Sequence, residues 1–177
     1  MSKTKVVFRA DGNSEIGLGH VIRSLALSEM LKKEFDCVFA IQEPSEALYE
    51  QIMAACGNII QLPACSENEY TFINELDNYL FGNEIVVLDG YRFSTNYQQQ
   101  IKSKGCSLVC IDDIHSYYFV ADAIINHAGG ISKDEYSSEK YTQFYLGPQF
   151  ALLRPPFLMS HRSLQNATSI TSLLINI

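Results

Sequence analysis

A glycine-containing loop near the start of the chain carries the residues best suited to chemistry. It runs from Asp11 to His20 with the sequence Asp-Gly-Asn-Ser-Glu-Ile-Gly-Leu-Gly-His, so that Gly17 and Gly19 precede the histidine. Glycines let a backbone approach a ligand closely, and free N–H groups at the start of a helix attract an anion. An imidazole at that position can exchange a proton near neutral pH. The loop predicts a proton-transfer site centred on His20, with a capping or buried structural histidine as the alternative.

Further polar side chains follow other strand-like runs. They are Arg9 and Asp11 after the first run, then Asp89 with Tyr91, Asp112 with Asp113, and Asn126 with His127. Ligands of open α/β sheets bind beyond the carboxyl ends of the strands, so these side chains are expected to meet at one edge. Asp89 either caps its own loop or orients His20, and Tyr91 either offers an aromatic surface to a sugar or packs. Adjacent side chains at a strand end point apart, so no metal site is expected at Asp112 and Asp113.

Short apolar runs alternate with segments of helical periodicity along the chain. The strand-like runs are residues 5–9, 37–41, 58–62, 85–88, 107–111 and 123–125. Helices are expected over residues 18–34, after Ser45 as the N-cap, over residues 66–81 and over residues 94–104. This order predicts an α/β fold with a doubly wound, mostly parallel sheet of the Rossmann type. The continuous apolar run at 85–88 predicts a central strand covered on both faces.

The last part of the chain has a different pattern. Residues 146–156 end in Pro155-Pro156, which cannot continue a helix or a central strand and therefore indicates a crossing segment. A new apolar run extends from Ile170 to Ile177. We expect a first, Rossmann-like domain over residues 1–157. Residues 158–177 are expected to hold a linker and the first strand of a largely missing nucleotide-binding domain.

Composition limits the partners that the chain can have. It has 177 residues, a formal net charge of −7, 47% hydrophobic residues and five cysteines. The negative charge gives no global electrostatic support to nucleic-acid binding. No apolar segment approaches the length needed to span a bilayer, and no signal peptide opens the chain. We expect a cytoplasmic globular protein with reduced cysteines, no nucleic-acid partner and no membrane insertion.

Several short motifs occur in an order that is familiar from one family. They are Phe8-Arg9-Ala10-Asp11, residues 16–25 (Ile-Gly-Leu-Gly-His-Val-Ile-Arg-Ser-Leu), Leu88-Asp89-Gly90-Tyr91, Ile111-Asp112-Asp113 and residues 147–154 (Gly-Pro-Gln-Phe-Ala-Leu-Leu-Arg). Together they resemble the hydrolase of the pseudaminic acid pathway, which cleaves UDP from UDP-2,4-diacetamido-2,4,6-trideoxy-β-L-altropyranose. The resemblance implies a two-domain GT-B fold, of which this chain is the amino-terminal half. It also implies a role in nonulosonic acid and surface polysaccharide biosynthesis.

The resemblance also implies roles for individual residues. It places the family's loop histidine on His20 and its tyrosine on Tyr91. The implied reaction is attack of water on the anomeric carbon with UDP as the leaving group, without a cofactor or a metal. His20 would activate or position the water, Tyr91 would orient the sugar or water, and Asp11 or Asp89 would stabilise positive charge. The residues expected to bind the substrate are Arg9, Asp11, Gly17, Gly19, Asn126 and Arg154.

Two other functions stay open at this point. A glycosyltransferase on the same scaffold would use His20 to activate an acceptor hydroxyl instead of water. Membrane-associated transferases of this kind display a basic, apolar acceptor patch, and the sequence has no clear one, which favours the hydrolase. The other alternative is a non-catalytic sugar-binding half that needs another polypeptide for the nucleotide.

Overall fold

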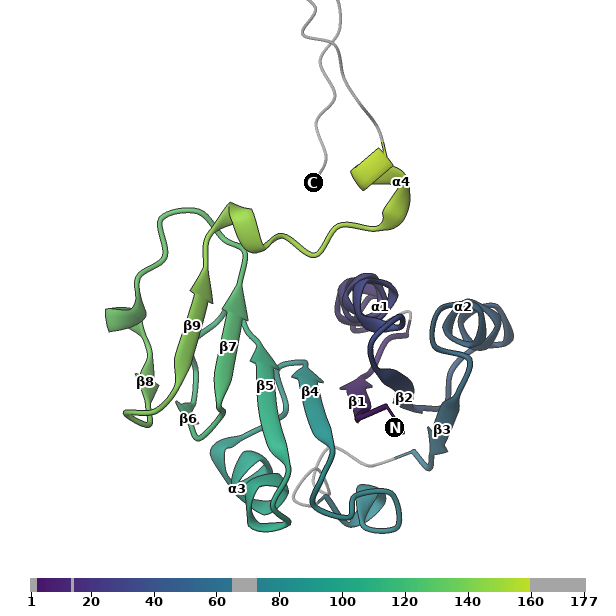
Figure 1. Ribbon diagram of the computed structural model, residues 1–177, viewed down its shortest axis with the longest axis horizontal. Helices are drawn as coiled ribbons and strands as arrows, with labels where there is room; N and C mark the ends of the chain where they lie inside the picture. Colours follow the sequence, from purple (N-terminus) through teal and green to yellow (C-terminus); the bar gives the residue numbers. More distant parts are fainter. Residues whose placement is uncertain (1–2, 14, 65–72, 160–177) are drawn as a thin grey trace, which may run out of the picture.

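A computed structural model describes residues 3–13, 15–64 and 73–159 of the chain. Within these residues, seven strands form one sheet in which every neighbouring pair is parallel (Figure 1). The strands are β1 (Lys5–Ala10), β2 (Asp36–Gln42), β3 (Ile59–Leu62), β4 (Ile85–Asp89), β5 (Ser107–Ile111), β7 (Ala123–Asn126) and β9 (Gln143–Leu146). Their spatial order is β3-β2-β1-β4-β5-β7-β9. This is a doubly wound, Rossmann-like α/β fold, as the sequence predicts.

Helices cover both faces of the sheet. Helices α1 (Gly19–Leu31) and α2 (Glu46–Cys56) lie on one face (Figure 1). Helix α3 (Thr95–Ser103) and the short 3₁₀ helix η1 (Ile73–Leu76) lie on the other. The Ser45 hydroxyl accepts a hydrogen bond from the Leu48 N–H at 3.3 Å and so caps α2 as predicted, and Ser94 caps α3 in the same way.

The remaining elements follow the fifth strand in the chain. A small second sheet pairs β6 (Tyr118–Phe119) with β8 (Ser137–Ser138), which are parallel. The 3₁₀ helices η2 (Lys133–Glu135) and η3 (Pro148–Phe150) precede the five-residue helix α4 (Pro155–Met159). Residues 151–154 are irregular and lead from the β9 side of the sheet back towards α1 (Figure 1). This return path is the crossing segment that the two prolines indicate.

Side chains of the central strands contribute to two separate hydrophobic cores. Because side chains alternate along a strand, Val7 and Val86 face the α3 side, whereas Phe8 and Val87 face the α1 side. All four are buried. This confirms that the apolar run at 85–88 forms a central strand covered on both faces. The two cores hold β1 and β4 rigidly side by side, and the loops that follow these strands therefore have fixed starting points.

The structure corrects three details. The expected helix over residues 66–81 is wrong in its described part, since Ile73–Leu76 is one 3₁₀ turn followed by turns, while residues 66–72 lie outside the described residues. Leu76 and Leu80 are buried, so short turns satisfy the apolar spacing that indicated a helix. Strand β9 was not predicted. The paired strands β6 and β8 were not predicted either.

The boundary between domains stays a prediction. Helix α4 (Pro155–Met159) spans the expected boundary at residue 157 and begins with two prolines, which the first turn of a helix tolerates. The apolar run from Ile170 to Ile177, the expected first strand of a second domain, lies outside the described residues.

Candidate active site

The candidate site lies where the carboxyl ends of β1 and β4 are neighbours. The chain order reverses between these strands, which is the position where doubly wound sheets bind ligands. The loop after β1 closes on itself through a hydrogen bond from the Gly17 N–H to the Asn13 carbonyl at 3.0 Å. The Asn13 side chain accepts further bonds from the N–H groups of Glu15 and Ile16. This compact loop delivers His20 into the first turn of α1.

His20 is bonded to a buried carboxylate. Its Nδ1 lies 2.7 Å from Oδ1 of Asp89, which is fully buried at the end of β4. Arg23 binds both oxygens of the same carboxylate at 2.7 Å, through Nη2 to Oδ1 and Nε to Oδ2. The Ser24 hydroxyl donates to Oδ2 at 3.2 Å. Of the two alternatives for Asp89, the geometry is therefore that of a carboxylate that orients the imidazole.

These contacts bear on which ring nitrogen of His20 carries a proton. A carboxylate accepts hydrogen bonds, so the short contact to Asp89 favours a proton on Nδ1. Arg23 Nη2 also lies 3.1 Å from Nδ1, but its shorter bond is to Asp89. A proton on Nδ1 leaves the lone pair on Nε2, which is the arrangement that a general base needs.

Tyr91 and Asp113 complete the cluster around His20. The rings of His20 and Tyr91 meet edge to face, with centroids 4.6 Å apart and an interplanar angle of 87°. Arg23 Nη1 donates to Asp113 Oδ2 at 2.8 Å. Burial raises the pKa of Tyr91, and the neighbouring Asp113 carboxylate raises it further. Burial raises the pKa of Asp113, but bonding to Arg23 outweighs this and lowers it below the usual value.

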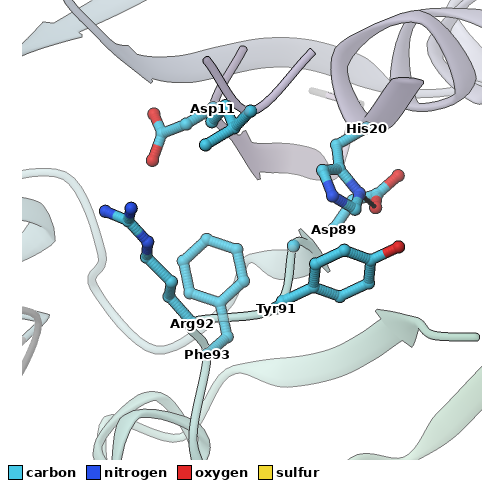
Figure 2. Close-up of a pocket in the computed structure, with 8 residues that line it drawn as sticks. Asp11, His20, Asp89, Tyr91, Arg92 and Phe93 are labelled. Atoms are coloured by element: carbon cyan, nitrogen blue, oxygen red, sulfur yellow. Dashed lines mark hydrogen bonds and ion pairs between the residues drawn. The ribbon is translucent and has the colours of Figure 1, made fainter. Parts of the chain in front are cut away.

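Two cavities open on either side of His20 and Tyr91. The first has a volume of about 250 Å³ and is lined by Asp11, Asp89, Arg92 and Phe93 as well (Figure 2). Figure 2 shows the Phe93 ring between the side chains of Arg92 and Tyr91. The second has a volume of about 500 Å³ and is also lined by Arg23, Asp113, His127 and Arg154. Ile16, His20 and Tyr91 form the wall that the two cavities share.

Arg9 is a fully buried cation beneath the first cavity. It forms ion pairs with Asp11 at 2.6 Å and with Glu75 at 2.8 Å, and its guanidinium carbon lies 5.3 Å from the centre of the Phe93 ring. Burial opposes the charge of Arg9, but the two carboxylates outweigh it and raise the pKa of the guanidinium. Asp11 also accepts the backbone N–H of Gln42 at 2.9 Å. Arg9 therefore fixes the carboxylate that lines the cavity.

The predicted site residues fall into two groups. Lining the cavities are His20, Asp89, Tyr91, Asp11, Gly19 and Arg154. Arg9, Gly17 and Asn126 line neither of these two cavities. Asn126 is 1% exposed, and its side chain donates to the Tyr136 hydroxyl and accepts from the Ala128 N–H. A role for these three residues in binding substrate stays a prediction.

Sequence reasoning missed Arg23 and Ser24 as members of the cluster, whereas it expected Asp113 at this edge of the sheet without giving it a role. One signal was available, because His20, Arg23 and Ser24 stand at positions i, i+3 and i+4 and so share one face of α1. Their common partner could not be read from that spacing. It required knowing that α1 crosses the ends of β4 and β5.

Two kinds of feature are absent from the described part of the chain. It contains no group of three or more His, Cys, Asp or Glu side chains placed to hold a metal ion. None of its helices has the length and apolar character needed to cross a membrane.

No family model matches the chain. It is 23% identical over 158 residues to the uncharacterized protein MJ1062 of Methanocaldococcus jannaschii, covering 86% of this chain and 31% of that protein. It is 31% identical over 110 residues to the UDP-2,4-diacetamido-2,4,6-trideoxy-β-L-altropyranose hydrolase of Campylobacter jejuni, covering 62% of this chain and 36% of that protein. It is 25% identical over 151 residues to the spore coat polysaccharide biosynthesis protein SpsG of Bacillus subtilis, covering 84% of this chain and 42% of that protein. The chain thus spans well under half the length of these relatives, two of which are named for sugar or polysaccharide biosynthesis.

Proposed function

We propose that this chain is the sugar-side half of an enzyme of polysaccharide biosynthesis that hydrolyses a nucleotide sugar. The proposed reaction is release of UDP from a UDP-diacetamido-trideoxy sugar by attack of water on the anomeric carbon. One observation carries the proposal: His20 is oriented by buried Asp89 at the wall shared by two cavities. The name of one relative supplies the substrate class, and the name of another supplies the link to polysaccharide biosynthesis.

The linings of the two cavities suggest which part of such a substrate each cavity would hold. The second cavity has the Arg154 guanidinium and the His127 ring in its lining, and N–H donors of this kind favour the phosphate groups of a nucleotide. The first has Phe93 and Tyr91 beside the carboxylate of Asp11, and aromatic faces with a few polar groups suit a sugar ring. The anomeric carbon, which joins sugar to phosphate, would then lie against His20.

The chemistry follows from this placement. The lone pair on Nε2 of His20 would accept a proton from water as the water oxygen bonds to the anomeric carbon. The bond from that carbon to the phosphate oxygen breaks, and UDP leaves with the bonding electron pair. Positive charge develops on the sugar ring in the transition state, and Asp11 lies on the side of the cavity where it would stabilise that charge. UDP is a good leaving group, so the reaction does not demand a strong general acid.

An isotope experiment on the complete natural polypeptide tests the reaction. The protein is incubated with UDP-2,4-diacetamido-2,4,6-trideoxy-β-L-altropyranose in ¹⁸O-water, and both products are analysed by mass spectrometry. The label is expected in the sugar, because water attacks carbon. Label in UDP would mean attack on phosphorus. Release of UDP only after an acceptor is added would identify a glycosyltransferase, and substrate binding without release would identify a non-catalytic half.

Variants test the part played by His20. His20→Gln is expected to lower kcat by about 10²-fold or more, the usual contribution of a general base. Tyr91→Phe tests the hydroxyl beside Asp113. Its matched control is Tyr145→Phe, because Tyr145 is a partly exposed tyrosine on β9 that lines neither cavity. Unchanged UDP release by a folded His20→Gln protein would exclude the proton-transfer role.

A further inference from the structure

Arg23 is the side chain that joins the separate parts of the candidate site. It lies one helical turn after His20 on α1 and is mostly buried. Its guanidinium makes two bonds to Asp89, at the end of β4, and one to Asp113, just after β5. A guanidinium is planar and rigid, so these three bonds fix both carboxylates relative to one another.

The two bonds to Asp89 control His20. A carboxylate bonded to His20 alone could turn about its terminal torsion, which is a soft and broad rotation. The forked contact with Arg23 stops that rotation and points Oδ1 at Nδ1 of His20. Arg23 also supplies the positive charge that a fully buried carboxylate needs.

The bond from Arg23 to Asp113 affects the position of the Tyr91 side chain through Asp113. Asp113 lies close enough to the Tyr91 side chain to raise the pKa of its hydroxyl. The Tyr91 ring in turn meets the edge of the His20 ring at 4.6 Å. Each member of this cluster therefore contacts the next, and the last contacts the first. The order is His20, Asp89, Arg23, Asp113 and Tyr91. Arg23 is the member that is bonded to both carboxylates.

We propose that Arg23 is a positioning residue, whose bonds to Asp89 and Asp113 hold His20 with its proton on Nδ1 and keep Tyr91 against it. The catalytic consequence rests on the proposed function, but the placement of the proton is a property of the unliganded protein. Lysine cannot replace Arg23 in this role, because a single ammonium group lacks the planar fork that holds both oxygens of Asp89.

Nuclear magnetic resonance of the histidine ring tests the proposal without any substrate. Long-range ¹H–¹⁵N correlations of the folded chain at about pH 8, where an ordinary histidine is neutral, report which ring nitrogen carries the proton. The His20 signals are assigned by their loss in His20→Gln. In the wild type we expect a protonated Nδ1 and an unprotonated Nε2. In Arg23→Lys we expect Nε2 to become protonated in a large part of the population.

Two further variants keep the test decisive. Asp113→Asn changes a partly exposed side chain, so the protein is expected to remain folded even if Arg23→Lys is not. It should leave the proton of His20 on Nδ1 and move the ring signals of Tyr91. The control is Lys32→Gln, which removes an ion pair with Glu29 at the far end of the same helix and should change neither set of signals.

Activity gives an independent measurement. Arg23→Lys is expected to lower kcat by about 10²-fold, the cost of a misplaced catalytic group, with a smaller change in KM. A wild-type His20 with its proton on Nε2, or an Arg23→Lys protein that keeps it on Nδ1, would overturn the proposal. So would an Asp113→Asn protein with unchanged Tyr91 signals. Absence of UDP release would instead count against the proposed function and leave the ring signals readable.

Discussion

Asp89 is a carboxylate held in the protein interior by four hydrogen bonds, two of which come from Arg23. Asp89→Asn keeps the shape but removes the charge, and its single amide oxygen cannot accept all four bonds. Arg23 is then left without its main counter-ion. We expect the free energy of unfolding to fall by about 3–5 kcal/mol, as measured by urea denaturation.

The control for this prediction is an ion pair at the surface. Asp77 pairs with Lys104 and is 47% exposed, so Asp77→Asn should cost less than about 1 kcal/mol. Equal losses in Asp77→Asn and Asp89→Asn would show that the buried cluster does not contribute specially to stability.

Glu84 predicts a dependence of stability on pH. This carboxylate is 3% exposed, and its Oε2 accepts the backbone N–H groups of Phe81, Gly82 and Asn83 at 2.9–3.2 Å. Burial raises the pKa of Glu84, but these bonds outweigh burial and lower it. A lowered pKa in the folded state stabilises the protein above the pKa of the unfolded chain. That stabilisation is lost as the pH falls through the folded value.

The pH effect is measured with Glu84→Gln. Its free energy of unfolding should be lower than that of the wild type at about pH 6. The gap should narrow at a second, lower pH, below the ordinary glutamate pKa of about 4.3, as the wild-type carboxylate takes up a proton. A gap that stays constant between the two pH values would mean that Glu84 acts through shape rather than charge. The comparison uses urea denaturation at both values.

Gly12, in the turn between β1 and α1, has little room for a side chain. A Cβ at this position would lie 2.8 Å from Cγ2 of Val21 and 3.2 Å from the carbonyl oxygen of Gly17. Val21 is fully buried and β-branched, so it has little room to move. Gly12→Ala is expected to displace the start of α1 and to lower the free energy of unfolding by about 1–3 kcal/mol.

Gly129→Ala is the matched control, because a Cβ there meets nothing within 4 Å. It should change the free energy of unfolding by less than about 0.5 kcal/mol in thermal or urea unfolding. If Gly12→Ala were equally harmless, the turn would have to be more adaptable than its contacts indicate.

At the scale of elements, periodicity predicted most helices and strands because their apolar side chains face a sheet or a core. Periodicity failed where apolar residues at helical spacing reach the core without forming a helix. Leu76 and Leu80 reach the core from short turns, while the carboxylate of Glu75, the residue before Leu76, binds Arg9, Gln42 and Tyr97. Strand β9 was missed because it is short and lies at the sheet edge, where partial burial weakens the apolar pattern.

At the scale of the whole molecule, the sheet should resist exchange most strongly at its centre. Strands β1 and β4 are paired on both sides and buried on both faces, whereas β9 has a single neighbour in the sheet. Amide hydrogens of Phe8 and Val87 are expected to exchange at least about 10²-fold more slowly than that of Tyr145. Hydrogen–deuterium exchange measures this directly. Equal rates would mean that the sheet opens only as a single unit.

The sequence predicted the location of the site better than its internal connections. Doubly wound topology places the loops after β1 and β4 together, so the meeting of His20 and Asp89 could be expected. The bonds from Arg23 to Asp89 and Asp113 depend on the angle at which α1 crosses the sheet, which no local pattern specifies. The extent of the first domain, given as residues 1–157, stays a prediction.

The bonds of Arg23 also bear on how the protein reaches its native state. They join residues 66 and 90 positions apart in the chain, so they form only after the intervening strands have docked in parallel order. Closing such long loops is entropically unfavourable, and folds rich in contacts of this kind fold slowly. We therefore expect the bonds that orient His20 to form late in refolding. Its ring resonances would time the arrival of β5 at the sheet, after most of the helical signal has already been recovered.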